Sequence, residues 1–232
     1  MKTLGIIGGM SPASTVLYYQ TINQLVNQAC GGNTSAPLLI DSVNFEVIAQ
    51  RQRQGDWQGM GQILANSAKK LCDAGADGIL LATNTMHKVA GDIISVIDVP
   101  FIHIIDATAD AIHQQGISQV ALLGTAFTMS EPFYRDKMAK QGIDCLVPTE
   151  QEQVLIHQII FDELTLGVVN ESSKQAYLHI IERLIQAGAK GVVLGCTEIG
   201  LLISQADVCV PVFDTANIHA MAAAKFILDD KN

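Results

Sequence analysis

Short apolar runs alternate with longer amphipathic stretches along the whole chain. The strands predicted from the apolar runs are Thr3–Ile7, Leu38–Val43, Gly78–Ala82, Phe101–Ile104, Val120–Leu123, Gly191–Leu194 and Val210–Phe213. The helices predicted between them are Ser14–Ala29, Gly59–Ala74, Thr85–Ile97, Ala107–Gln115, Glu131–Gln141, Gln151–Leu166, Ser172–Ala187 and a last one from Ala216. Strands that are separated by helices are typical of βαβ units, so the pattern predicts an α/β fold with parallel sheets.

An internal repeat is the most informative feature of this pattern. Ala74–Thr83 (AGADGILLAT) matches Ala187–Cys196 (AGAKGVVLGC), about half the chain further on. Leu4–Gly8 likewise resembles Val120–Gly124. A single AGAxG segment is an ordinary helix end that leads into a buried strand. Two copies with matching partners indicate a duplication instead.

The duplication predicts two pseudo-symmetric α/β lobes, each a parallel-type sheet flanked by helices. The N-terminal lobe is expected to span 1–104, completed by 213–232, and the C-terminal lobe to span 105–212. In open α/β sheets, ligands bind beyond the carboxyl ends of the strands. We therefore expect the active site in the cleft between the lobes, with Thr83 and Cys196 on either side of one ligand.

Composition and charge exclude several classes of function. The chain has 14 basic and 23 acidic residues, a net charge of −9 and no basic run, which argues against partners such as nucleic acid or anionic membranes. No apolar run has the length of a membrane helix, and the N-terminus lacks the apolar core of a signal peptide. The five cysteines are dispersed without a CxxC motif, which favours a reducing cytoplasm over a disulfide framework. The six histidines show no ligand spacing, so no metal is predicted.

Cys196 is the first candidate for chemistry. It lies in Gly195–Glu198, directly after a buried strand and at the start of a predicted helix. The N–H groups and the dipole of a helix N-terminus would lower the pKa of the thiol and favour the thiolate. The alternative is a buried structural cysteine. Glu198 could orient the thiol, bind a substrate amine or cap the helix.

The equivalent place in the first half holds Thr83, followed by Asn84 and Thr85. These residues could hold a carboxylate or stabilise an enolate, or they could be ordinary helix caps. Gly8–Pro12 follows the first strand, and Gly-Gly lets a ligand approach the backbone closely. The tract lacks GxGxxG and Walker spacing, so a nucleotide is not predicted. Thr125, after Gly124, is its counterpart in the second half.

Two arginines and one histidine add to this set. Arg51 and Arg53 lie in a polar stretch that is either a solvated face or, if one of them reaches the cleft, a carboxylate clamp. His87 comes four residues after Thr83 and could reach the same site.

At these residues the chain resembles the aspartate/glutamate racemase family, in particular its aspartate racemase branch. The resemblance rests on Ile7–Pro12 (IGGMSP), Thr83–His87 (TNTMH) and Gly195–Ile199 (GCTEI), which span nearly the whole chain. It implies two α/β lobes, a homodimer and racemisation of a small amino acid without a cofactor. In this family two cysteines work on opposite faces: one takes the Cα proton and the other returns one.

Residue by residue, the resemblance assigns the second-half acid/base to Cys196. It implies that Asn84, Thr85 and Thr197 bind the α-carboxylate, and that Met10, Ser11 and Gln52 or Arg53 line the pocket. The expected catalytic pair is Thr83 and Cys196. The expected substrate-binding set is Met10, Ser11, Gln52, Arg53, Asn84, Thr85, Thr125, Thr197 and Glu198.

The chain departs from the family at two positions. Thr83 stands where most members have cysteine, and a hydroxyl is a poorer base than a thiolate. In the family the second-half cysteine generally serves the L-enantiomer, so the resemblance implies efficient proton abstraction from the L-enantiomer by Cys196 and a weak or absent reaction from the D-enantiomer. Leu166 precedes Gly167 where aspartate-type members often have a basic residue, which leaves room for a neutral or longer substrate.

Three functions compete on this basis. The leading one is a PLP-independent racemase of aspartate or glutamate that favours the L-enantiomer. A single second-half cysteine also resembles decarboxylase-like members of the superfamily, in which one thiol protonates an enolate after loss of CO₂. The third is a non-catalytic protein that binds an acidic amino acid.

Overall fold

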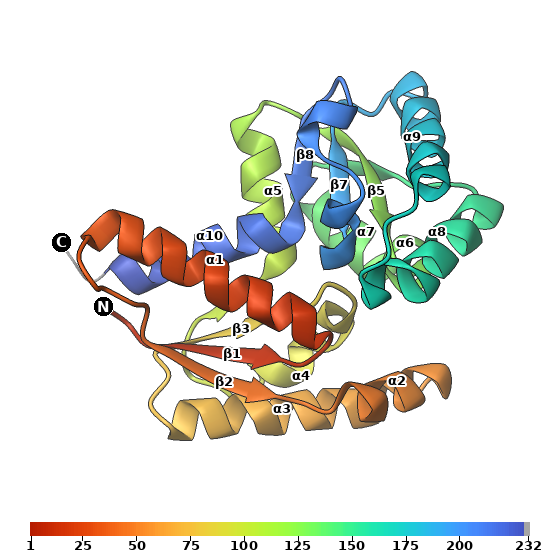
Figure 1. Ribbon diagram of the computed structural model, residues 1–232. Coiled ribbons are helices and arrows are strands. Elements are labelled where there is room, and N and C mark those ends of the chain that lie inside the picture. Colours follow the sequence, from red (N-terminus) through yellow and green to blue (C-terminus); the bar gives the residue numbers. More distant parts are fainter. Residues whose placement is uncertain (230–232) are drawn as a thin grey trace. The chain divides into compact units, whose positions relative to one another are not determined.

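The chain forms two compact units in the computed structural model, which describes residues 1–229 (Figure 1). The first unit consists of Met1–Ile104 together with the segment from His219 onwards, and the second is Ile105–Ile218. Residue 213, where the sequence pattern placed the return to the first lobe, lies in a strand of the second unit. Residues 230–232 of that expected segment lie outside the described residues.

The first unit contains a four-stranded parallel sheet. Its strands are β1 (Leu4–Gly8), β2 (Leu38–Ser42), β3 (Gly78–Leu81) and β4 (Phe101–Ile102), in the order β2-β1-β3-β4. Its helices are α1 (Pro12–Cys30), α2 (Phe45–Arg53), α3 (Trp57–Asp73), the 3-10 helix η1 (Thr85–Val89), α4 (Ala90–Ile94) and most of α10 (Thr215–Leu228). Helix α1 covers one face of the sheet and α3 covers the other (Figure 1).

The second unit repeats this arrangement. Its strands are β5 (Gln119–Gly124), β6 (Asp144–Leu146), β7 (Val192–Gly195) and β8 (Val212–Asp214), in the order β6-β5-β7-β8. Its helices are α5 (Ile104–Gln114), α6 (Ala126–Ser130), α7 (Pro132–Lys140), α8 (Glu150–Asp162), η2 (Leu164–Leu166), α9 (Glu171–Gln186), η3 (Thr197–Leu201) and η4 (Gln205–Asp207). The two sheets have the same strand order, so the predicted α/β fold with two repeated parallel sheets is confirmed.

Each sheet packs its buried strands against amphipathic helices. Strands β1, β3 and β7 are buried along their whole length, as expected for parallel strands that are covered on both faces. Helix α3 contributes an apolar stripe to the first core, formed by Met60, Leu64, Ala68 and Leu71. The second core gathers side chains of β5, β7, α8 and α9. Rigid strands of this kind can hold the loops at their carboxyl ends in fixed places.

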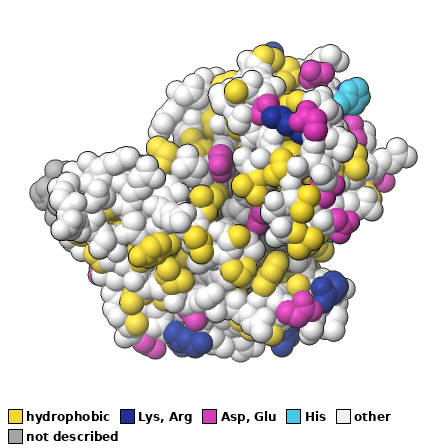
Figure 2. Space-filling model, viewed as in Figure 1, with side chains coloured by type: hydrophobic (Ala, Val, Ile, Leu, Met, Phe, Trp, Pro, Cys, Tyr) yellow, Lys and Arg dark blue, Asp and Glu magenta, His cyan; other side chains and the backbone are white. Residues whose placement is uncertain are grey.

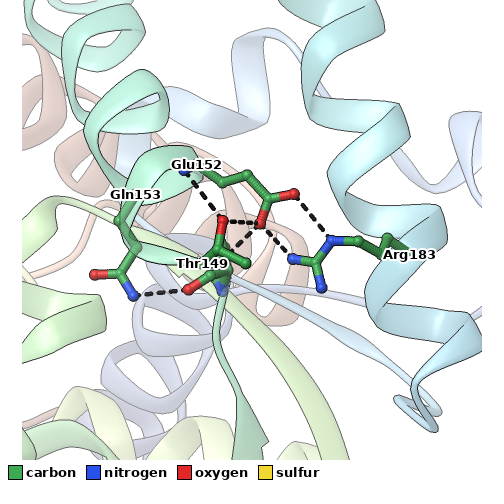
Figure 3. Close-up of polar contacts among 5 residues, drawn as sticks. Thr149, Glu152, Gln153 and Arg183 are labelled. Atoms are coloured by element: carbon green, nitrogen blue, oxygen red, sulfur yellow. Dashed lines mark hydrogen bonds and ion pairs between the residues drawn. The ribbon is translucent and has the colours of Figure 1, made fainter.

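Helices α8 and α9 are joined by a polar network that begins at the first turn of α8 (Figure 3). Thr149 and Glu152 form a capping box, in which the Thr149 N–H donates to Glu152 Oε2 at 2.8 Å. Arg183 of α9 donates from Nε to Glu152 Oε1 at 2.9 Å, and its Nη2 pairs with Oε2. The same carboxylate therefore caps the N-terminus of α8 and links this helix to α9.

The structure contains elements that the hydrophobic pattern did not predict. Helix α2 has a single buried residue, Ile48, so it carries no apolar stripe for a periodicity argument to find. The short elements α6 and β6 were missed as well. The helix predicted over Thr85–Ile97 divides into η1 and α4.

Gly9 fixes the turn from β1 towards α1. Its φ is +91°, and a Cβ at this position would lie 2.2 Å from the carbonyl oxygen of Val43. We expect Gly9→Ala to lower the free energy of unfolding by about 2 kcal/mol or more, because strain and a backbone clash add up. For a chain of this size, Tm should fall by about 5 °C or more in a thermal melt. Gly31→Ala is the matched control, because Gly31 also has a positive φ of 75° but faces open space. Equal losses in the two variants would contradict the clash.

Candidate active site

In each unit, the predicted site residues follow two neighbouring strands. Strands β1 and β3 pair directly, with Ile7 opposite Leu81. The loop that begins at Gly8 therefore lies beside the loop that carries Thr83. In the second unit Gly124 pairs with Gly195. The structure thus brings Met10, Ser11, Thr83, Asn84 and Thr85 to one sheet edge, and Thr125, Cys196, Thr197 and Glu198 to the other.

The loop after β1 is tied down by the first turn of α1. Ser11 is the N-cap, and its Oγ accepts the N–H of Ser14 at 3.2 Å. The Gly9 N–H donates to Thr15 Oγ1 at 2.8 Å, and that hydroxyl donates to the Ser11 carbonyl at 3.0 Å. The side chain of Met10 is buried in the core of the first unit. Ser11 is therefore the half-buried polar group of this loop.

Thr83 opens the loop after β3. It is half-buried, and its N–H donates to the Leu81 carbonyl at 2.9 Å. Asn84 and Thr85, which follow it, are buried. This buried polar sequence comes directly after a buried apolar strand, which is the position in a parallel sheet where ligand-binding groups are found.

Arg51 and Arg53 lie in the last turn of α2, and each forms an ion pair within the first unit. Arg53 Nη2 lies 2.7 Å from Glu46 Oε1, and both side chains are exposed. Arg51 pairs with Asp56, the N-cap of α3. On the face shown in Figure 2, basic side chains likewise lie beside acidic ones. A carboxylate clamp at Arg53 would require this guanidinium to exchange Glu46 for the ligand. Gln52, its neighbour on α2, is half-buried.

Cys196 is the N-cap residue of η3, and its thiol is hydrogen-bonded to a carboxylate. The Sγ donates to Glu198 Oε2 at 3.0 Å, and the Thr197 hydroxyl donates to the same oxygen at 2.6 Å. All three residues are half-buried, and Cys196 packs against the core of the second unit. A thiol that points at a carboxylate oxygen has a proton acceptor within reach.

The pKa of Cys196 shifts in the direction opposite to the sequence-based prediction. Burial raises the pKa of the thiol well above its ordinary value, and the charge and hydrogen bond of Glu198 raise it further. Backbone N–H groups of Thr197 and Glu198 lower it, but by less. The predicted lowering of this pKa is therefore wrong, because burial and the neighbouring Glu198 carboxylate outweigh the backbone N–H groups at the start of η3. With a raised pKa, Cys196 is a protonated thiol at neutral pH, and a base must take its proton before it can act as a thiolate.

Thr125 occupies the end of β5, next to the Cys196 loop. It is buried and forms the N-cap of α6, where its Oγ1 accepts the Thr128 N–H at 3.4 Å. Its Oγ1 also lies 3.2 Å from Thr128 Oγ1. The hydroxyl of Thr125, which belongs to the predicted substrate-binding set, is therefore hydrogen-bonded to Thr128 of α6.

His87 was not part of the predicted substrate-binding set, but it contacts the Thr83 loop. Its Nδ1 lies 2.7 Å from the Thr83 carbonyl oxygen. The signal in the sequence is that His87 comes four residues after Thr83. The spacing alone does not show that the imidazole binds the backbone rather than a ligand.

Within residues 1–229, no three His, Cys, Asp or Glu side chains are grouped so that they could hold a metal ion. Over the same residues, no helix combines the length and the apolar character that crossing a membrane requires. The two sheet edges carry hydroxyls, the Cys196 thiol, the carboxylates of Glu198 and Asp214, the Asn84 carboxamide and backbone amides.

The chain is similar to known proteins in both sequence and fold. The sequence model of the Asp/Glu/hydantoin racemase family matches residues 7–223. A candidate Asp/Glu racemase from Yersinia pestis is 48% identical, with a TM-score of 0.94 over 98% of this chain and 100% of that one. An aspartate racemase homologue from Pyrococcus horikoshii is 39% identical, with a TM-score of 0.85 over 98% of this chain and 99% of that one. A broad-specificity amino-acid racemase from Bacillus subtilis is 22% identical over 92% of both chains.

Proposed function

The chain belongs to the Asp/Glu/hydantoin racemase family, and on that premise we propose that it racemises L-aspartate or L-glutamate without a cofactor. Cys196 acts on one face of Cα and Thr83 on the other. The observation that carries this proposal is the hydrogen bond from the Cys196 thiol to Glu198 at the end of β7. Support for the pairing comes from Thr83, which follows β3 as Cys196 follows β7 in two sheets of the same strand order.

The first half-reaction begins with the thiol. Glu198 takes the proton of Cys196, which leaves a thiolate and a carboxylic acid. The thiolate then removes the Cα proton of the L-amino acid and becomes a thiol again, and the substrate becomes a planar carbanion. Asn84, Thr85 and Thr197 hold the α-carboxylate, over which the negative charge spreads. Met10, Ser11, Thr125 and Gln52 or Arg53 line the rest of the pocket.

The second half-reaction takes place at Thr83. Its hydroxyl gives a proton to the opposite face of the carbanion and receives one from water. Glu198 returns its proton to the hydroxide that is left, so Thr83, Cys196 and Glu198 all end as they began. In the reverse direction the same hydroxyl would have to act as the base, which it does poorly. We therefore expect α-proton exchange to be faster from the L-enantiomer than from the D-enantiomer.

The proposal is tested by α-proton exchange in D₂O, followed by NMR with L- and D-aspartate and L- and D-glutamate supplied separately. Chiral chromatography of the same samples detects inversion. Exchange from the L-enantiomer together with D-product is the expected result. Exchange without inversion would remove Thr83 from the mechanism, and no exchange with any of the four would refute the proposal.

A second candidate function follows because only one of the two equivalent strand ends carries a thiol: Cys196 follows β7, whereas Thr83 follows β3. A decarboxylase needs only one acid, so Cys196 would protonate an enolate formed by loss of CO₂, and Thr83 would have no proton to transfer. That enzyme would act on a disubstituted malonate and leave amino acids unchanged. A binding protein would show neither reaction, but its Tm would rise with an acidic amino acid.

The resemblance also leads us to propose a homodimer that works in the cytoplasm. Light scattering on the purified chain of 24.9 kDa tests the dimer directly, because the dimer has twice that mass.

Glu198→Gln separates two effects of this carboxylate. Its removal takes away a charge and a hydrogen bond that raise the pKa of Cys196, so the thiolate should form at lower pH. If Glu198 accepts the thiol proton, however, exchange at neutral pH should fall by about 10- to 100-fold. Absorbance of the thiolate, measured as a pH titration against Cys196→Ala, reports the pKa, and NMR exchange reports the rate. A rate that rises with the thiolate fraction would show that Glu198 is not the base.

A further inference from the structure

A buried imidazole holds the backbone at Thr83. His87 is 4% exposed, and its Nδ1 lies 2.7 Å from the Thr83 carbonyl oxygen. On its other side, Nε2 accepts the N–H of Ile104 at 3.2 Å. A carbonyl can only accept and a backbone N–H can only donate. The proton of the ring must therefore reside on Nδ1, and His87 is the neutral Nδ1–H tautomer.

A second imidazole makes a similar pair of contacts, and its backbone partner lies two residues before Ile104, in β4. His219 donates from Nε2 to the Ile102 carbonyl at 2.8 Å, and its Nδ1 accepts the Tyr18 hydroxyl at 2.9 Å. Burial lowers the pKa of His219 to about 3, which agrees with a neutral ring. The ring centroids of His87 and His219 are 5.9 Å apart, and His103 lies 4.5 Å from His87.

These contacts connect Thr83 to the places where the chain leaves and re-enters the first unit. Ile104 is the last residue before the chain enters the second unit, and His219 is the first residue after it returns. His87 links the Thr83 carbonyl to Ile104, the first residue of α5, while His219 binds the Ile102 carbonyl of β4. The loop of Thr83 is thus attached to the start of α5 through a side chain, in addition to the pairing of β3 with β4.

We propose that His87 is a positioning residue for the proton transfer at Thr83. This inference rests on the function proposed above. His87 does not act on the substrate: it fixes the Thr83 peptide, which in turn fixes the direction of the hydroxyl. A displacement of about 1 Å at a reacting group costs as much as about 100-fold in rate, so a held carbonyl matters for this step. The thiol chemistry at Cys196 does not depend on this contact.

Two variants of the full chain separate the two hydrogen bonds of the His87 imidazole, one to the Thr83 carbonyl and one from the Ile104 N–H. The amide nitrogen of Asn reaches the place of Nδ1, so His87→Asn keeps the donor to Thr83 and loses the acceptor for Ile104. The amide oxygen of Gln reaches the place of Nε2, so His87→Gln keeps the bond to Ile104 and loses the one to Thr83. A thermal melt of each variant measures the structural cost of either change.

The readout is the ratio of two rates on the L-enantiomer: D-product formation and α-proton exchange. For His87→Gln we expect this ratio to fall by about 10- to 100-fold, with KM unchanged, because only the step at Thr83 is impaired. His87→Asn should keep a ratio close to that of the unmodified chain. The imidazole ¹⁵N spectrum of the unmodified chain should also show the Nδ1–H tautomer for His87.

Several outcomes would overturn the inference. One is an equal loss of exchange and D-product in both variants, which means that His87 only supports folding. Others are an unchanged ratio in His87→Gln or an Nε2–H tautomer. Failure of the proposed function looks different, because the unmodified chain would then form no D-product from L-substrate, with or without exchange.

Discussion

Cys196→Ala is expected to lose α-proton exchange from L-aspartate or L-glutamate by about 10³-fold, because Cys196 is the proposed base that removes the Cα proton and an alanine side chain cannot accept a proton. The side chain is small and half-buried, so its loss should leave the fold intact. The measurement is NMR exchange in D₂O over several hours, which is sensitive enough for a residual rate.

Cys209→Ala is the matched control for this variant. Cys209 is exposed and lies outside both sheet edges, so its removal tests whether the loss of any thiol affects the assay. Exchange should be unchanged in Cys209→Ala. Exchange that persists in Cys196→Ala, at a rate near that of the unmodified chain, would remove Cys196 from the mechanism.

Thr83→Cys is expected to raise the rate of exchange from the D-enantiomer by about 10-fold or more. A free cysteine thiol has a pKa of about 8.5 and can form a thiolate, whereas a threonine hydroxyl stays protonated at every pH at which the protein is assayed. The substitution restores a base at the strand end equivalent to that of Cys196. Exchange and chiral analysis with D-aspartate and D-glutamate measure the gain.

Thr83→Ser is the control for that gain, because it keeps the hydroxyl while it changes the size of the side chain. Exchange from the D-enantiomer should stay as low as in the unmodified chain. If Thr83→Cys folds with an unchanged Tm and yet gains nothing on the D-enantiomer, Thr83 does not face Cα. The second half-reaction would then belong to another residue.

The sequence pattern was sufficient for the fold and for the position of the candidate site along the chain. Continuous apolar runs such as Gly78–Ala82 predict buried parallel strands, and the structure has β3 there. The repeated AGAxG segments predict that Thr83 and Cys196 follow equivalent strands, which they do. These predictions succeed because periodicity and repetition record which face of an element is buried.

Side-chain direction and desolvation were beyond the reach of the pattern. Spacing placed Glu198 two residues from Cys196 but did not show that the thiol is desolvated and donates a hydrogen bond to this carboxylate, so the predicted sign of the pKa shift was wrong. The pairing of Arg53 with Glu46 depends on α2, a helix that lacks an apolar stripe. The bond from His87 to the Thr83 carbonyl depends on a ring orientation that residue type does not determine.

The discontinuous first unit has a consequence for biosynthesis. The second unit is one continuous segment, whereas the first requires a helix from the end of the chain. That helix supplies His219 to Tyr18 and Ile102, and its Ile227 carbonyl accepts the N–H of Lys2 at 3.0 Å. During synthesis, every residue of the unit that carries Cys196 is therefore made before the last segment of the unit that carries Thr83, from His219 onwards, although the second unit is translated later than most of the first. A transcript that ends early would yield a protein with its thiol in place and its threonine loop unsupported.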